Sequence, residues 1–281
     1  YTSEKRGRGG AFVAFEDAFS GHLFPDRAER SILYRNLGNG RFQDVTAATG
    51  LGSAGWSGDA GVADVNGDGY LDLYALNMQG ADHFFENVKG ERFVDATAQR
   101  FPRTPWGSMG VKFFDADGDG SQDLLITDMH SDMSVQVNPD QEKRKAAIQW
   151  NEAFLTGRTG QFIFGNALFR RLEGGGFEDR SDAAGVENYW PWGPSVGDLN
   201  ADGWPDVFIA SSMNFPFRYG VNTLLLNERG QRFLDSEFVL GVEPRRNGQT
   251  DTHWFDVPCG VPGSPCQGRQ GTMPVRGAIG S

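Results

Sequence analysis

Three short segments of the chain repeat one order of oxygen-bearing side chains and glycines, and no other feature restricts the fold as strongly. They span residues 64–72 (loop 1), 115–123 (loop 2) and 198–206 (loop 3), with Asp or Asn at positions 1, 3, 5 and 9 and Gly at position 6. Glycine allows the sharp turn with which a chain wraps a hard cation, and carboxylate, amide and carbonyl oxygens are calcium ligands. The pattern therefore predicts three calcium sites, with side-chain oxygens from positions 1, 3, 5 and 9 and a backbone carbonyl from position 7. The predicted ligands are Asp64, Asn66, Asp68, Tyr70 and Asp72; Asp115, Asp117, Asp119, Ser121 and Asp123; and Asp198, Asn200, Asp202, Trp204 and Asp206.

The loops differ from those of EF-hand proteins. Position 12, where an EF-hand has a bidentate Glu, is apolar and is occupied by Ala75, Ile126 and Ile209. A short apolar run leaves each loop, which predicts a buried strand where an EF-hand has a helix. One Asn-Gly-Asp-Gly segment would also suit a plain hairpin turn. Three copies of the same ligand pattern favour calcium over that alternative.

A second motif alternates with the loops and sets the architecture. It is a run of four residues that begins with two apolar side chains and is followed by Phe, Asp and then Ser or Thr, and its four copies span 33–46, 84–97, 168–181 and 224–236. The loops and this motif share a period of about 50 residues, typical of propeller blades that cannot bury their apolar faces alone. We therefore expect an all-β fold, with one β-propeller domain over residues 1–281 or a fragment of one.

One interval between repeats is longer than the others because of an insertion at about residues 129–163. Within it, residues 139–150 begin with Pro and carry acidic residues in the first turn, which predicts a helix. Insertions in repeat arrays often carry recognition, and packing of this segment over a blade edge is the alternative. The apolar anchors that we expect in either case are Trp150, Phe154 and Phe162.

Charge and hydropathy argue against a nucleic-acid partner and against a membrane-spanning segment. The formal net charge of −11 argues against nucleic-acid binding, which needs clustered Lys and Arg. No run of the sequence approaches the roughly 18 apolar residues of a membrane span. We expect neither a nucleic-acid partner nor a membrane-spanning segment.

The two cysteines, Cys259 and Cys266, lie in the Pro- and Gly-rich segment 257–271. A disulfide that closes this segment is favoured over free thiols, because little else would order it. A disulfide indicates an oxidising compartment, and weak calcium sites are filled by the millimolar calcium outside cells. Both features predict a secreted, periplasmic or cell-surface protein.

The calcium loops resemble those of FG-GAP/VCBS repeats in β-propellers such as the heads of integrin α-subunits. Their alternation with residues 33–46, together with segments 127–133 and 239–246, is similar to the bacterial relatives of cartilage acidic protein, the ASPIC/UnbV group. This resemblance implies a calcium-binding extracellular or periplasmic propeller without a defined activity. Two departures lead us to expect an incomplete ring: the first repeat unit (12–46) has no acidic loop, and the last residues approach a blade that does not follow.

The strongest candidate for catalysis is the set Asp128, His130 and Asp132, which alternation along an extended segment would place on one face. Polar residues that satisfy loop backbone groups are the stronger interpretation. We therefore predict a non-enzymatic scaffold that binds another protein or a cell-surface component, with no catalytic residues and three Ca²⁺ ions. The alternative is a hydrolase or lyase on a propeller scaffold that acts on polysaccharide.

Overall fold

The computed structural model shows three four-stranded antiparallel sheets in which the strands pair in chain order. It describes residues 30–52, 55–78, 80–129, 162–188, 190–211, 213–214, 218–219, 222–237, 239–242, 253–260, 262 and 271–276. Sheet 1 contains β3 (Ser57–Ala63), β4 (Asp72–Asn77), β5 (His83–Val88) and β6 (Arg92–Asp95). Sheet 2 contains β8 (Ser108–Phe114), β9 (Asp123–Asp128), β11 (Ala167–Arg171) and β12 (Phe177–Asp179). Sheet 3 contains β13 (Pro191–Gly197), β14 (Asp206–Ser211), β17 (Thr223–Asn227) and β18 (Phe233–Asp235).

The remaining elements are short. A hairpin of β1 (Tyr34–Gly38) and β2 (Arg41–Asp44) precedes sheet 1, and β7 (Thr104–Pro105) pairs in parallel with β10 (Phe162–Ile163). A further sheet has the order β15-β16-β20-β19, formed by Met213–Asn214, Arg218–Tyr219, Gly271–Arg276 and His253–Cys259. The helices α2 (Thr46–Thr49), α3 (Thr97–Arg100) and α6 (Ser181–Ala184) are one turn each.

The second sequence motif forms the third and fourth strands of a repeat and the turn that follows. In sheet 1, Asp95 Oδ1 accepts hydrogen bonds from the backbone N–H and the hydroxyl of Thr97 at 3.0 and 2.6 Å, and the Thr97 hydroxyl accepts one from Phe84 N at 2.8 Å. Asp44 with Thr46 and Asp179 with Ser181 repeat this arrangement. The Asp-x-Thr spacing therefore starts the short helix and ties it back to the third strand.

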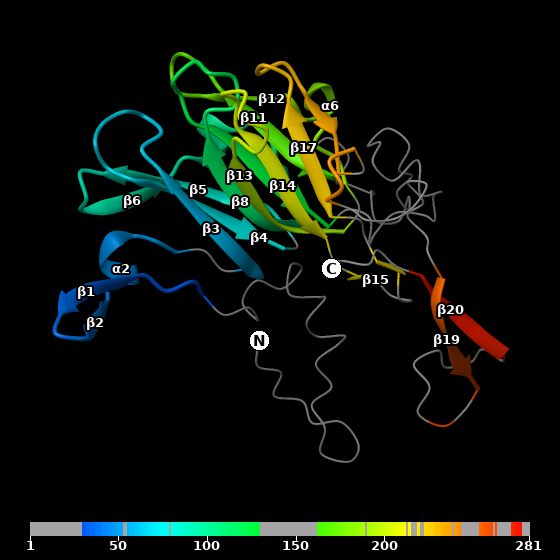
Figure 1. The fold of residues 1–281 in the computed structure, drawn as a ribbon. Helices are drawn as coiled ribbons and strands as arrows, with labels where there is room; N and C mark the ends of the chain where they lie inside the picture. Colours follow the sequence, from blue (N-terminus) through cyan, green and yellow to red (C-terminus); the bar gives the residue numbers. More distant parts are fainter. Residues whose placement is uncertain are drawn as a thin grey trace.

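Sheet 2 lies between the other two sheets, and the core lies at its two faces (Figure 1). All six residues of β9 are buried. Because side chains alternate across a strand, Leu124 and Ile126 join Tyr74 and Phe84 in a cluster with sheet 1, whereas Leu125 packs with the sheet-3 residues Val207, Ile209 and Leu225. Each fully buried Leu contributes about 1.5–3 kcal/mol. This stacking holds consecutive sheets side by side in chain order.

The prediction of an all-β architecture is confirmed in its coarse form. Within the part of the chain that the structure describes, the sheets form no closed ring, so the propeller arrangement stays a prediction. Among the described residues, no helix is long and apolar enough to cross a membrane.

Most of the predicted insertion, with its helix and the anchors Trp150 and Phe154, lies outside the described residues. Phe162 is described, and its ring packs edge-on against that of Trp106 with centroids 4.8 Å apart. At this residue, the insertion packs on the protein itself, as the alternative interpretation expects.

Candidate metal centre

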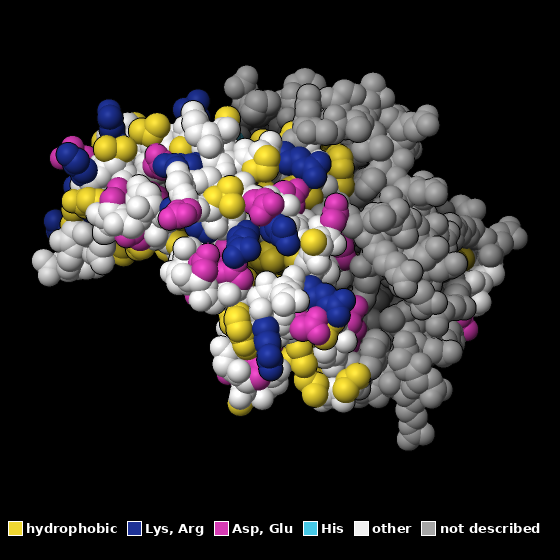
Figure 2. Space-filling model, turned by 90° about the horizontal axis from the view of Figure 1, so that it is seen from above, with side chains coloured by type: hydrophobic (Ala, Val, Ile, Leu, Met, Phe, Trp, Pro, Cys, Tyr) yellow, Lys and Arg dark blue, Asp and Glu magenta, His cyan; other side chains and the backbone are white. Residues whose placement is uncertain are grey.

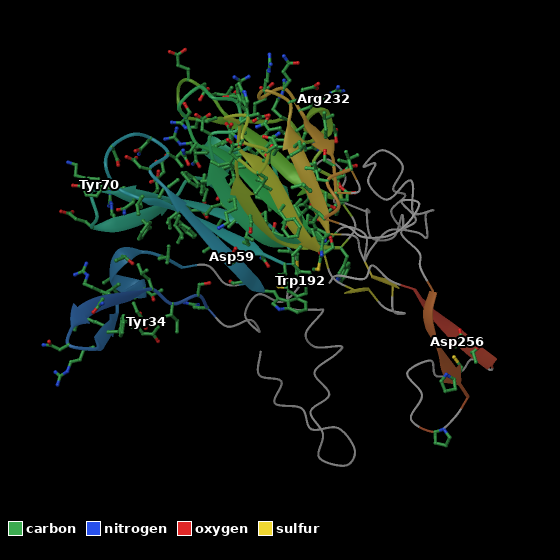
Figure 3. All side chains as sticks on the ribbon, in the orientation of Figure 1. Tyr34, Asp59, Tyr70, Trp192, Arg232 and Asp256 are labelled. Carbon is green, nitrogen blue, oxygen red and sulfur yellow. The ribbon has the colours of Figure 1, made fainter. Side chains whose placement is uncertain are left out.

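The three acidic loops occupy equivalent places in the three sheets, because each connects the first strand of its sheet to the second. Loop 1 joins β3 to β4, loop 2 joins β8 to β9, and loop 3 joins β13 to β14. Figure 3 shows Tyr70 of loop 1 far from Asp59, which lies toward the opposite end of β3. The three loops that repeat in the sequence thus occupy equivalent positions in the fold.

The first Asp of each loop organises the turn. Asp64 Oδ1 accepts hydrogen bonds from Gly67 N and Asp68 N at 2.8 and 3.1 Å, and its Oδ2 accepts one from Gly69 N at 2.8 Å. Asp115 accepts three equivalent bonds at 2.8–3.1 Å, and Asp198 accepts bonds from Asp202 N and Gly203 N. The loop backbone is therefore curled around one carboxylate in each case.

Position 6 requires glycine for a conformational reason. Its φ angle is +87° at Gly69, +86° at Gly120 and +90° at Gly203, a left-handed conformation that other residues rarely adopt. The glycine turn predicted from the sequence is confirmed in all three loops. Asp or Asn at positions 3 and 5 then accepts bonds from N–H groups two residues ahead, such as Asp119 N to Asp117 Oδ1 at 3.2 Å.

The Asp at position 9 is buried and, besides its predicted role as a ligand, accepts hydrogen bonds from two backbone N–H groups. Asp123 Oδ2 accepts a 3.0 Å bond from Ala116 N in its own loop, and its Oδ1 accepts a 2.8 Å bond from Arg171 N on the third strand. Asp72 and Asp206 make the equivalent pairs of bonds. Burial, with Asp117 and Asp119 nearby, raises the pKa of Asp123 to about 6. This residue fixes the loop to its sheet whether or not it also binds an ion.

Loop 2 brings its carboxylates closest together. Asp115, Asp117 and Asp123 each place one carboxylate oxygen within 4.8 Å of the others. An ion that binds oxygens at about 2.3–2.6 Å can bridge groups so spaced, and carboxylates are suitable donors for a hard cation. Loops 1 and 3 differ because position 3 is Asn66 or Asn200, whose amide donates a 3.0 Å bond to Asp68 or Asp202. The other predicted ligands lie in the three loops, and their binding of calcium stays a prediction.

Each of the first two loops is held by the next sheet. Arg171 of sheet 2 donates from Nε to the carbonyl of Val65 in loop 1 at 2.9 Å, and Asn227 of sheet 3 donates from Nδ2 to that of Ala116 in loop 2 at 2.8 Å. A Cβ added to Gly118 in loop 2 would lie 3.1 Å from the Trp204 ring of loop 3. The loop geometry of one repeat therefore depends on its neighbour.

The alternative catalytic set is represented in the structure by Asp128. This residue is buried at the end of β9, and its carboxylate accepts bonds from Gly107 N at 2.6 Å and Gly165 N at 3.1 Å. His130 and Asp132 lie outside the described residues. The contacts of Asp128 satisfy loop backbone groups, as the structural interpretation expects.

A buried carboxyl that the sequence did not single out joins sheets 1 and 2. Asp82 contacts the hydroxyls of Tyr74 and Ser108 at 3.1 and 2.7 Å and accepts a bond from Asn77 N at 2.7 Å. Burial raises its pKa to about 8. The residue has no exposed surface, so the shift reflects its burial between the two sheets.

Comparison with protein families finds the FG-GAP-like repeat three times, at residues 15–75, 64–126 and 149–209. Each matched segment ends at position 12 of one acidic loop, which is the fourth residue of the strand that leaves the loop. No curated protein matches the chain.

Proposed function

We propose that this chain, which belongs to the FG-GAP-like repeat family, is a calcium-binding β-propeller that serves as a scaffold for binding or assembly outside the cytoplasm. The observation that carries the proposal is the repeated loop, which has the same turn around its first Asp in three equivalent places. A fold alone does not determine function, and the chemistry of these loops is what supports the proposal.

Calcium is the ion that the donor set favours. The side chains offer only oxygen, from Asp carboxylates and Asn amides, and flexible oxygen shells suit Ca²⁺ better than the strict octahedron of Mg²⁺. Loop 2 supports the proposal most directly, because Asp115, Asp117 and Asp123 already converge. In this proposal the ions offset the repulsion among the clustered carboxylates.

Calorimetric titration of chelator-treated protein tests the proposal. We expect three calcium sites and weaker binding of magnesium. Each ion at a concentration about a hundred-fold above its dissociation constant adds roughly 2.7 kcal/mol to the folded state, so the melting temperature should fall when calcium is removed. If the titration shows no calcium binding and the melting temperature is the same with and without chelator, the loops are ordinary turns.

The extracytoplasmic location rests on two features. Calcium sites of this type are filled where calcium is millimolar. The second feature is the proposed pairing of Cys259 with Cys266. Cys259 is buried at the end of β19, and Cys266 lies outside the described residues. Mass spectrometry of unreduced peptides from natively exported protein should recover the two cysteines in one cross-linked peptide. Two alkylated thiols would leave the calcium loops alone to support this location.

The partner that we propose is another protein or a cell-surface component, because an insertion such as residues 129–163 in a regular repeat array often carries recognition. Deletion of residues 134–160 should weaken association with a partner co-purified from the native source while three-site calcium binding persists. Loss of calcium binding or of folding on deletion would instead make the insertion part of the core.

A further inference from the structure

We propose that the β1–β2 hairpin of one copy of this chain binds the sheet-3 end of a second copy, with the packing that joins consecutive repeats within the chain. The hairpin surface consists of Tyr34, Asn36 and Phe42. The sheet-3 surface consists of Leu199 in loop 3 and Val242 in the turn after β18. The second copy is a partner beyond those of the proposed scaffold, and the contact does not depend on ion binding by the loops.

The hairpin corresponds to the third and fourth strands of a complete sheet. Tyr34 is 55% exposed, whereas the residues with the same pairing in sheets 1, 2 and 3 are at most 2% exposed. The four pairs that define this equivalence are Tyr34 with Asp44, Phe85 with Asp95, Phe169 with Asp179 and Leu225 with Asp235. Phe42 is 62% exposed, whereas its equivalents Phe177 and Phe233 are 4% and 6% exposed. The apolar face that the complete sheets bury is therefore exposed in the hairpin.

One residue that covers this face within the chain follows the short helix of the preceding repeat. Phe101 follows α3, and its ring stacks on that of Phe177 in sheet 2 with centroids 4.4 Å apart. Val186 lies two residues after α6 and belongs to the same buried cluster as Leu225 and Phe233 of sheet 3. The turn after a short helix thus packs on the third and fourth strands of the next repeat.

Position 2 of an acidic loop is the second feature that meets this face. Val65 in loop 1 and Ala116 in loop 2 are buried, and their carbonyls accept hydrogen bonds from Arg171 and Asn227 on the third strand of the next sheet. Asn36 has the same place in the hairpin, because it pairs with the Phe of the fourth strand as those two donors do. An Asn side chain suits this bond, since Asn227 makes it within the chain.

After β18 the chain repeats the turn that follows the short helices. Leu240 N donates to Ser236 O at 3.0 Å, and Gly241 has a φ angle of +70°, as the glycines after α2 and α6 do at +73°. Val242 follows Gly241 as Leu51 follows the glycine after α2. Leu51 is 5% exposed and Val242 is 39% exposed. The turn is therefore formed, but its apolar residue is accessible.

Loop 3 adds the second feature at the same end of the chain. Leu199 at position 2 is 54% exposed, whereas Val65 and Ala116 are 7% and 5% exposed. Figure 2 shows hydrophobic side chains among charged ones over the described surface, and such scattered exposure alone marks no interface. Here, however, the equivalent positions of other repeats are buried by a known contact. The sheet-3 surface offers what the hairpin surface needs.

A second copy is the partner that matches both surfaces. The hairpin lies beside sheet 1, and sheet 2 separates sheet 1 from sheet 3, so the two surfaces are at opposite ends of the row of sheets (Figure 1). Between copies, Val242 packs on Phe42, and Asn36 donates to the carbonyl of Leu199. Because the contact joins two different surfaces, it repeats from copy to copy and gives a closed ring or a chain of copies.

Sedimentation velocity of the full chain over a range of concentrations, with calcium held saturating, tests this contact. We expect the average mass of wild type to rise with concentration. Phe42→Glu and Val242→Glu should each weaken self-association about ten-fold or more, because the contact would bury an unpaired charge. Tyr34→Glu should act as Phe42→Glu does. All three side chains are exposed in the single chain, so the melting temperature of the dilute variants should stay that of wild type.

A mixture of two variants gives the sharper result. Phe42→Glu keeps the sheet-3 surface and Val242→Glu keeps the hairpin surface, so an equal mixture should form a one-to-one complex that grows no further. Val94→Glu changes a residue of β6 that is 43% exposed and lies outside both surfaces, and it should associate as wild type does. A wild type that is monomeric at every concentration, or a mixture that does not associate, would overturn the contact. Neither result bears on calcium binding by the loops, which calorimetry measures separately.

Discussion

The side-chain amide of Asn227, at the end of β17 in sheet 3, donates a 2.8 Å hydrogen bond to the carbonyl of Ala116, the second residue of loop 2. Arg171 of sheet 2 makes the equivalent contact with Val65 of loop 1. A residue of one repeat thus completes the loop of the repeat before it. Such nearest-neighbour contacts are the means by which repeat arrays become cooperative.

Replacement of Asn227 by Ala measures this coupling, and Asn87→Ala is its matched control. Both side chains bond a carbonyl of their own loop and the N–H three residues ahead, but only Asn227 also bonds the preceding loop. We expect Asn227→Ala to lower the free energy of unfolding by about 1–3 kcal/mol more than Asn87→Ala, because the buried Ala116 carbonyl loses its donor. Urea unfolding in saturating calcium gives both values, and equal losses would show that the cross-sheet bond contributes nothing.

Two aspartates of loop 3 should separate ion binding from structural support. Asp206 is fully buried and accepts bonds from Leu199 N and Asn227 N, whereas Asp202 is exposed. In chelator, we expect Asp206→Ala to lose about 2–4 kcal/mol, since two N–H groups lose their acceptor, and Asp202→Ala to stay within about 0.5 kcal/mol of wild type. In calcium, both variants should show two sites by calorimetry. A third site retained in Asp202→Ala would remove that residue from the ligand set.

The sequence contained enough information for the loops and their flanking strands. Asp and Gly at fixed positions set the local turn, and the apolar runs after each loop became β4, β9 and β14. These features depend on residues close together in the chain, where side-chain to backbone bonds are decided locally. The Asp-x-Thr motif was also visible, although its role in starting a short helix was not. In the fourth copy of the motif the hydroxyl residue lies one position earlier. Ser236 N donates to Leu224 O, and the equivalent bond in the first copy is made by Val45 N with Leu33 O, one residue before Thr46.

Contacts between repeats could not be predicted in the same way. The Asn227–Ala116 bond joins residues 111 positions apart, and the Arg170–Asp117 pair depends on how strand and loop fold over each other. Asp82 belongs to no motif, and only the packing of sheet 1 on sheet 2 makes it a buried acid. Tertiary proximity, not local pattern, decides these features.

Gly110 of β8 lies at a close contact between sheets 2 and 3. A Cβ at this position would lie 2.6 Å from Pro194 Cδ and 2.9 Å from Trp192 O, so the two sheets would have to separate. We expect Gly110→Ala to destabilise the protein by about 1–3 kcal/mol through overpacking. Gly197→Ala in β13 is the control, because no atom lies within 4 Å of its added Cβ. Thermal unfolding measures the effect. If both substitutions lower the melting temperature equally, the close contact is contradicted.

Asp82→Asn should change how stability depends on pH. The folded-state pKa of Asp82 is about 8, against an ordinary value of 3.8, so the folded protein binds this proton more tightly than the unfolded chain does. Stability from this group is therefore fully present below about pH 4 and is lost as the pH rises toward 8. The amide of Asn resembles the protonated acid and can keep contacts with Tyr74, Asn77 and Ser108, so the variant should lack this loss.

The measurement is the free energy of unfolding in urea at several pH values between 5 and 9, with calcium held saturating. Wild type should lose stability across this range relative to Asp82→Asn, with the difference growing until the pH passes the folded pKa. Ser108→Ala provides a directional control: its hydroxyl bond lowers the pKa of Asp82, so its removal should extend the loss to higher pH. Parallel pH profiles for wild type and Asp82→Asn would mean that Asp82 is not the titrating group.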